Sequence, residues 1–363
     1  MRTLTNVMIG VGLSLSASGN VHPGWTANRL LPVKASMDTT VTPVRHYIFF
    51  SRDREKIHTD TAFLLHPGIE GAQITYAWRQ LERAKDVYDF SEIEDDLNFL
   101  KSNGKKLFIQ VQDVTFWEKN HAVPEYLTTD TAYHGGEERQ CVTLENGQDR
   151  CGGWYARRWD PNVAARYHKL LQQLAEKFDG RIEGINLPET SIDVSEKKPP
   201  AGYSHERYLV AQKNNMKALR DYFKRSVPIL YANFMPGGTG YLKPLYDYAR
   251  EMKVGMGGPD IKVYRRMQMK NSYPLIRELS GIVPTGAAVQ DGNYNLINDK
   301  TKDTVKLAEI LDFAQHYLRL NYVFWCTEEP FYSKEVLPLL GRLHEAGVVR
   351  RNGQPVLSGL LVD

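Results

Sequence analysis

The residues with the clearest capacity for chemistry lie in the stretch RIEGINLPET, residues 181–190. Ile182 and Ile185 form an apolar alternation that stops at a proline and Glu189. This pattern predicts a short buried strand whose end carries the Glu189 carboxylate out of the core and into a cleft. The alternative is a helix N-terminus, where Glu189 and Thr190 would serve only to stabilise the first turn.

Other polar and aromatic residues stand at the ends of other strand-like segments. If the strands are parallel and close into one barrel, their carboxyl ends meet in a single cleft. Each residue also has a purely structural interpretation, such as Asp113 or Asp260 capping the next element, or Glu328 lying on a solvated rim. The strand-end residues are Trp78, Gln110, Gln112, Asp113, Asn186, Glu189, Asn233, Asp260, Gln290, Asp291, Trp325, Glu328 and Glu329.

Two carboxylates flanking a cleft are what glycoside hydrolysis requires, one as a proton donor and one as a nucleophile or base. The donor must keep its proton near neutral pH, so it needs burial or a nearby negative charge. No HxH or HExxH spacing predicts a metal site, and no GxSxG elbow predicts a serine nucleophile. We therefore expect neither a metal nor a cofactor.

The elements that must position these residues alternate between strand and helix. Helix-like segments, among them residues 91–103, 160–178, 205–224 and 304–318, separate most of the strands. Most of the strands are near-continuously apolar, as parallel strands covered on both faces are. The pattern predicts an α/β protein of the (β/α)8 (TIM) barrel type in a single domain. An open doubly wound sheet is the alternative, but no GxGxxG or P-loop follows any strand. The predicted strands are residues 45–51, 71–78, 106–113, 181–190, 227–235, 253–260, 283–291 and 322–327.

The first residues resemble a secretory signal, because Arg2 precedes a modest apolar run and then small residues. We interpret residues 1–19 as a signal peptide, 20–44 as a tail or covering segment and 45–363 as the barrel. A long irregular insertion covers residues 114–159, and loops of this length are usually functional. Within it, Cys141 and Cys151 flank a polar segment and could form a disulfide. We expect a secreted or periplasmic protein.

Composition narrows the classes of partner. The 363 residues carry a formal charge of +3, with 46 basic and 43 acidic side chains interspersed along the chain. No basic patch that would indicate nucleic-acid binding stands out. The apolar run near the N-terminus is too short to span a membrane. We expect a carbohydrate substrate, no nucleic acid and no membrane span, and the sequence leaves the oligomeric state open.

The stretch ITYAWRQLERAKDVYDFSEIEDDLNFLKSNGKKLFI, residues 74–109, resembles the opening of the retaining β-glycosidase clan of barrels. This clan includes the β-galactosidase, cellulase and xylosidase families, and the resemblance extends over roughly residues 45–346. In the clan, strand four ends in Asn-Glu, with the Glu as acid/base, and strand seven ends in the nucleophilic Glu. The resemblance implies that Glu189 is the acid/base and that Trp325 forms the sugar-binding floor.

The chain departs from the clan pattern at two places. Strand four reads Asn186-Leu-Pro-Glu189, so the Asn is displaced from the Glu. Strand seven reads AVQDGNY, with Gln290 and Asp291 where a Glu is expected. Gln290 cannot be a nucleophile, so Asp291 is the candidate for the second carboxylate, and Glu328 on the next strand is the other.

Three functional hypotheses follow. The first is an exported glycoside hydrolase that cleaves a β-linked oligo- or polysaccharide, with Glu189 as general acid/base and Asp291 or Glu328 as nucleophile or base. The second is a carbohydrate-binding barrel that lacks the nucleophile, which Gln290 favours, and the third is a barrel lyase. The residues expected to bind substrate are Trp78, Gln112, Asn186, Asn233, Asp260, Gln290 and Trp325.

Overall fold

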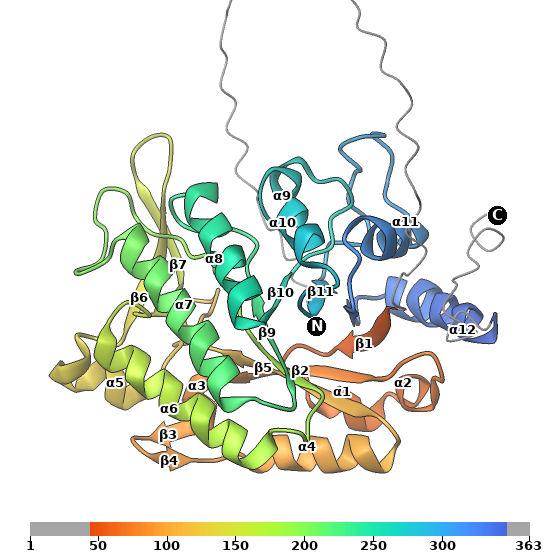
Figure 1. Ribbon diagram of the computed structural model, residues 1–363, viewed down its shortest axis with the longest axis horizontal. Helices are drawn as coiled ribbons and strands as arrows, with labels where there is room; N and C mark the ends of the chain where they lie inside the picture. The colour runs from red at the N-terminus through yellow and green to blue at the C-terminus, as the bar shows by residue number, and fades with distance from the viewer. Residues whose placement is uncertain (1–43, 347–363) are drawn as a thin grey trace, which may run out of the picture. The chain divides into compact units, whose positions relative to one another are not determined.

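The computed structural model describes residues 44–346. The predicted signal peptide, nearly all of the 20–44 segment and residues 347–363 lie outside this range. Eight parallel strands close into a barrel in the order β1-β12-β11-β10-β9-β8-β5-β2 (Figure 1). They are β1 (Arg45–Phe49), β2 (Gly71–Ala77), β5 (Lys106–Gln112), β8 (Gly184–Leu187), β9 (Val227–Tyr231), β10 (Gly255–Gly258), β11 (Thr285–Val289) and β12 (Tyr322–Cys326). The predicted (β/α)8 barrel is confirmed, and each of the eight predicted segments contains one strand.

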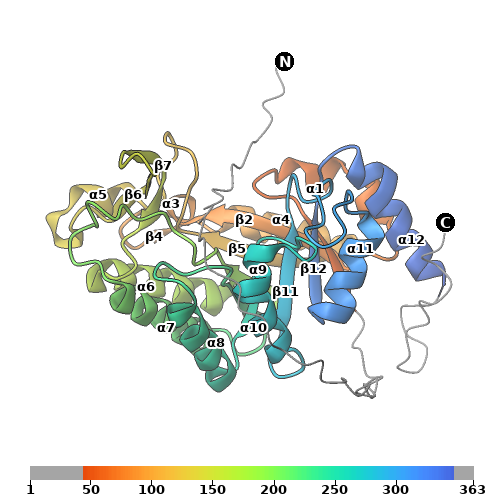
Figure 2. The same ribbon diagram turned by 90° about the horizontal axis from the view of Figure 1, so that it is seen from above.

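Helices cover the outside of the barrel, and α6, α7 and α8 lie next to one another in both views (Figures 1 and 2). The Asp160 carboxylate accepts hydrogen bonds from the N–H groups of Asn162 and Val163, and Pro161 occupies the first turn, which together fix the start of α6. The helices are α1 (Glu55–Thr59), α2 (Thr61–Leu65), α3 (Trp78–Leu81), α4 (Ser91–Ser102), α5 (Glu125–Thr129), α6 (Pro161–Phe178), α7 (His205–Tyr222), α8 (Thr239–Met252), α9 (Arg266–Lys270), α10 (Ser272–Leu279), α11 (Leu307–Asp312) and α12 (Leu337–Glu345).

Three shorter helical segments complete the helical layer. The predicted helix over residues 304–318 is divided, because α11 continues into a π-helical segment, and α12 is likewise preceded by one. These segments are the 3-10 helix η1 (Thr131–Tyr133) and the π-helical turns η2 (Phe313–Tyr317) and η3 (Tyr332–Val336).

Two small antiparallel hairpins stand outside the barrel. One joins β3 (Glu82–Ala84) to β4 (Val87–Tyr88), and the other joins β6 (Glu137–Thr143) to β7 (Asp149–Ala156). The second hairpin occupies the insertion predicted at residues 114–159 and stands beside the barrel (Figure 1). The structure joins Cys141 and Cys151, which pair across it, in a disulfide.

The barrel interior is filled by aromatic rings. Inward-facing side chains form a cluster that is separate from the core under the helices: Tyr47, Phe108, Ile229, Tyr231, Ala288, Tyr322 and Phe324. Glycines on β10 and β11 let these two strands lie close together. A Cβ added to Gly257 would lie 1.6 Å from the carbonyl oxygen of Gly286, so the two strands approach too closely there for any side chain.

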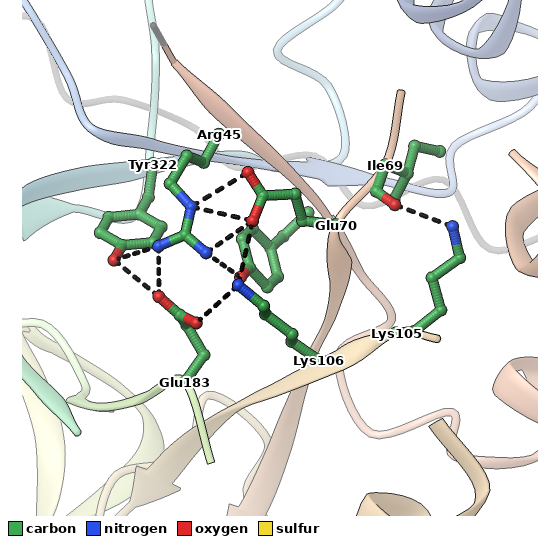
Figure 3. A network of polar contacts seen from close by, with 8 residues as sticks. Arg45, Ile69, Glu70, Lys105, Lys106, Glu183 and Tyr322 are labelled. Atoms are coloured by element: carbon green, nitrogen blue, oxygen red, sulfur yellow. Dashed lines mark hydrogen bonds and ion pairs between the residues drawn. The ribbon is translucent and has the colours of Figure 1, made fainter. Parts of the chain in front are cut away.

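A network of charged side chains closes the end of the barrel where the strands begin (Figure 3). The Arg45 guanidinium, at the start of β1, bonds the carboxylates of Glu70 and Glu183 and the hydroxyl of Tyr322. Lys106, at the start of β5, lies 3.4 Å from Glu70 and 3.3 Å from Glu183. These side chains come from residues at the starts of five of the strands, β1, β2, β5, β8 and β12. The network therefore ties together the strand starts, which are usually the stability face of such barrels.

Candidate active site

Glu189 lies just beyond the end of β8, at the opposite end of the barrel from the charged network. The neighbouring chain is fixed by hydrogen bonds at Thr190, whose N–H donates to the Tyr231 carbonyl at 3.0 Å and whose hydroxyl donates to the Phe234 carbonyl at 2.6 Å. The Tyr208 hydroxyl donates to the Thr190 carbonyl at 2.9 Å. These hydrogen bonds hold Thr190 rigidly. Because Glu189 is the preceding residue, they also set the direction of the Glu189 carboxyl group.

The Glu189 carboxyl is in an environment that favours its protonated form. Burial raises its pKa to about 7, and the negative charge of Asp260 raises it as well. A hydrogen bond of 2.6 Å from Asn233 Nδ2 to Oε2, together with the positive charges of Lys262 and Arg158, opposes this rise. Burial has the larger effect on the pKa, because a carboxylate loses more solvation free energy by leaving water than one hydrogen bond restores. A carboxyl with a pKa near neutrality can donate a proton at neutral pH.

Asp260 lies two residues beyond β10 and places another carboxylate near Glu189. Its Oδ2 forms an ion pair of 2.9 Å with Lys262 Nζ. Its Oδ1 is buried and has no hydrogen-bond partner within residues 44–346. A buried carboxylate oxygen without a partner is costly in a finished core, so this atom is available to a ligand hydroxyl or to water.

Polar side chains continue below the mouth into the barrel interior. Gln73 Nε2 donates to Asn186 Oδ1 at 2.8 Å and to the Tyr231 hydroxyl at 3.1 Å. The Thr75 hydroxyl donates to Gln110 Oε1 at 3.0 Å. Asn186, expected to contact substrate, is therefore fully buried beneath the mouth and already paired to Gln73.

The ends of β11 and β12 bring the other two predicted carboxylates together. Oxygen atoms of Asp291 and Glu328 and the Sγ of Cys326 all lie within 4.8 Å of one another. The Gly292 N–H donates to Glu328 Oε2 at 2.7 Å. Three such donor atoms could coordinate a metal ion, and no comparable group occurs elsewhere in residues 44–346. Gln290, half-buried, precedes Asp291 at the end of β11.

Both tryptophans expected at the cleft lie elsewhere. Trp325 is fully buried and its Nε1 donates to His46 Nδ1 at 3.2 Å. Burial lowers the pKa of His46 to about 4, which keeps this imidazole neutral and able to accept. Because Phe324 points into the barrel, the next residue along the strand points out toward the helices. The expectation that Trp325 forms a sugar-binding floor therefore does not fit this structure.

Trp78 occupies the first turn of α3 and is also fully buried. Its Nε1 donates to Glu82 Oε2 at 2.9 Å, and its ring lies 5.0 Å from that of Tyr167. The ring is thus part of the packing between α3 and α6, with no surface free to contact a substrate. Gln112, by contrast, lies on the rim and accepts a hydrogen bond of 3.2 Å from Arg52 Nε.

Two cations at the site were missed by the strand-end argument. Arg158 is buried and donates from Nη2 to Asp113 at 2.6 Å, from Nη1 to the Tyr208 hydroxyl at 2.6 Å and to the Glu189 carbonyl at 3.4 Å. It comes from the end of the insertion and not from a strand, so no periodicity marks it. Lys262 follows Asp260 by two residues, and the local turn of the chain brings the two side chains together.

Comparisons with known proteins bear on the fold. No family model matches the chain, and no curated protein matches its sequence. Among solved structures, the catalytic domain of a β-amylase from Paenibacillus polymyxa superposes with a TM-score of 0.53 at 11% identity, covering 78% of this chain and 92% of that one. A β-galactosidase from Bacillus circulans sp. alkalophilus gives 0.53 at 10% identity, covering 78% of this chain and 50% of its own.

A second β-galactosidase, from Marinomonas ef1, gives a TM-score of 0.50 at 9% identity, covering 78% of this chain and 54% of its own. The chain thus spans about half the length of each β-galactosidase that it matches. At such low identities the likeness establishes the barrel fold, which these glycoside hydrolases share with the chain. Between residues 44 and 346, no helix is both long and apolar enough to cross a bilayer.

Proposed function

We propose that the chain is a glycoside hydrolase that cleaves a β-linked oligo- or polysaccharide, with Glu189 as the proton donor. The observation that carries this proposal is the position of a carboxyl with a pKa of about 7 at the carboxyl end of a barrel strand. That is the end of a (β/α)8 barrel at which catalytic residues gather. The likeness to barrels of glycoside hydrolases supports the proposal at the level of the fold.

The second carboxylate is assigned to Asp291. It follows the seventh barrel strand and Glu189 the fourth, so the two residues lie almost opposite one another around an eight-stranded mouth. Asp291 is exposed, so its carboxylate can be reached from solvent. Glu328 is the alternative, because it lies beside Asp291. Its carboxylate accepts a hydrogen bond from the Gly292 N–H. Two carboxylates flanking a sugar ring would supply the acid and the nucleophile or base.

The remaining polar groups would position the sugar. Asn233 holds the Glu189 carboxyl. Asp260 Oδ1, which has no partner within residues 44–346, would accept a hydrogen bond from a sugar hydroxyl. In the reaction Glu189 would protonate the leaving glycosidic oxygen as the C–O bond breaks, and Asp291 would attack the anomeric carbon or activate a water for that attack. We also propose that the protein is exported, which the N-terminal sequence and the Cys141–Cys151 disulfide support.

The test is a screen of the purified protein against β-linked aryl glycosides and soluble polysaccharides, with Glu189→Gln beside the wild type. Turnover by the wild type that is lost in the variant supports the proposal. Asp291→Asn and Glu328→Gln then identify the second carboxylate, since azide rescues a lost nucleophile by forming a glycosyl azide. The anomer first released, followed by proton NMR, separates retention from inversion.

Gln290 favours one alternative, a barrel that binds carbohydrate without cleaving it, because an amide stands where the related clan has its nucleophile. Saturable binding of an oligosaccharide by wild-type protein, without turnover of any substrate in the screen, would establish this alternative in place of the hydrolase.

A further inference from the structure

Two adjacent aromatic side chains are exposed just beyond β5. Phe116 is 55% exposed and Trp117 is 62% exposed. A small group of large hydrophobic side chains within residues 44–346 is exposed to solvent, and Phe116 and Trp117 are its two aromatic members. Leaving two such rings in water forgoes the free energy of burying them, on the order of 2 kcal/mol each. Neighbouring exposed aromatics of this kind commonly mark a binding surface.

The turn that carries these rings is held firmly from below. The Thr115 N–H donates to the Trp154 carbonyl at 2.7 Å, and its hydroxyl donates to the Asn120 carbonyl at 2.6 Å. The Asn120 N–H donates to the Trp117 carbonyl at 3.0 Å, which closes the turn. A Cβ on Gly153 would lie 2.1 Å from the Thr115 carbonyl oxygen, so β7 packs directly against the turn. The rings are therefore presented on a rigid support.

The surroundings of the two rings are polar. Glu118 and Arg139 form an ion pair of 2.5 Å, and the Arg139 guanidinium lies 5.6 Å from the centre of the Trp154 ring. Trp154 Nε1 donates to the Glu118 carbonyl at 2.8 Å. Flat apolar faces framed by charged groups suit a sugar, which offers an apolar C–H face and a rim of hydroxyl groups. An apolar protein partner would have to remove water from this ion pair, which costs free energy without supplying new polar contacts.

The turn is continuous with the candidate active site. Asp113 lies three residues before Phe116, and three residues span at most about 11 Å of chain. The Asp113 carboxylate is bound by Arg158, whose Nη1 lies 3.4 Å from the Glu189 carbonyl oxygen. A second connection runs through Gln140, whose Nε2 donates to the Thr115 carbonyl at 2.6 Å and whose Oε1 accepts from the Asp193 N–H at 3.3 Å. Asp193 follows Glu189 by only four residues.

We propose that Phe116 and Trp117 form an outer sugar-binding site, and that the substrate is therefore a polysaccharide chain extending from the cleft across this turn. The inference rests on the proposed hydrolase function and adds the class of substrate to it. The turn binds sugar units that are not cleaved, so its contribution appears only with long substrates.

The first measurement is the ratio of kcat/KM on a soluble β-linked polysaccharide to kcat/KM on an aryl monoglycoside. In Trp117→Ala this ratio should fall about 10-fold or more, because one well-placed aromatic contact changes affinity by roughly that factor. Val210→Ala, which truncates a 55% exposed side chain on α7, is the matched control and should keep the wild-type ratio. A ratio in Trp117→Ala within twofold of the wild-type ratio would overturn the proposal.

The second measurement does not depend on turnover. Affinity electrophoresis in gels containing β-glucan, xylan or galactan compares Glu189→Gln with the double variants Glu189→Gln/Trp117→Ala and Glu189→Gln/Phe116→Ala. Retardation by one polysaccharide that weakens at least fivefold in both double variants supports the outer site, even if the hydrolase proposal fails. Absence of retardation by all three polymers, or dimerisation of the wild type that Trp117→Ala abolishes, would refute it.

Discussion

Asn233 and Glu189 are joined across two neighbouring barrel strands, because Asn233 Nδ2 donates a hydrogen bond of 2.6 Å to Glu189 Oε2. The bond holds one of the two oxygens of this carboxyl group in place. It also opposes the desolvation that raises the pKa of Glu189 to about 7. One amide therefore both orients the proposed proton donor and partly offsets the rise in its pKa that burial causes.

Replacing Glu189 by Gln should lower kcat by roughly 10²- to 10⁴-fold, the usual contribution of a positioned general acid. The matched control is Glu183→Gln, which makes the same change in the charged network at the other end of the barrel. We expect the folded Glu183 variant to keep its kcat. Equal losses in the two variants would indicate that both changes act through the fold.

The activity should depend on the protonated form of Glu189. Because the pKa of this carboxyl is about 7, kcat/KM should fall as the pH rises above about 7. On the acidic side kcat/KM should also fall, because the second carboxylate acts only in its ionised form. The check is a kcat/KM profile between pH 4 and pH 9, and a rate that stays level up to pH 9 would count against Glu189 as the acid.

Asn233→Ala should move the alkaline limb of that profile to higher pH. The Asn233 hydrogen bond favours the ionised carboxylate, so removing it leaves desolvation unopposed by that bond and the pKa of Glu189 rises further. Asn98→Ala, on the exposed face of α4, should leave the limb where it is. A shift of the limb to lower pH in Asn233→Ala would show that the assignment of the bond is wrong.

The free energy of unfolding should also depend on pH through the raised pKa of Glu189. A folded-state pKa of about 7, above the ordinary 4.5, means that the favourable protonated form stabilises the fold fully below pH 4.5 and that this stability is lost as pH rises through 7. The cost at pH 8 is about 3 kcal/mol. Glu189→Gln should therefore unfold at higher urea concentration than the wild type at pH 8, with the gap closing near pH 4. A variant less stable at pH 8 would mark Glu189 as a structural residue.

The charged network at the strand starts should contribute to stability and not to catalysis (Figure 3). Glu183→Gln breaks an ion pair in which Arg45 is about one-quarter exposed, so we expect a loss of about 1–3 kcal/mol in the free energy of unfolding. The hydrogen bond that Arg45 donates to Glu183 lowers the pKa of this carboxyl, although desolvation by burial raises it. The wild type should thus lose this stability as the pH falls below about 4.5, and urea unfolding at pH 7 and pH 3 will measure it.

Much of the fold could be predicted from local patterns. Eight apolar segments separated by helical periodicity determine the barrel, because a strand covered on both faces must be apolar along its whole length. The same segments show where each strand ends, which placed Glu189, Asn233 and Asp260 at the mouth. These placements depend only on residue order along single strands.

The tertiary structure decided which side of a strand faces the barrel interior. In a parallel strand both faces are apolar, so the sequence carries no alternation that tells Phe324, which points inward, from Trp325, which points outward. It also decided that Arg158, from an insertion distant in sequence, reaches Glu189. Long-range contacts of this kind arise from packing between elements, and no local pattern in the chain encodes them.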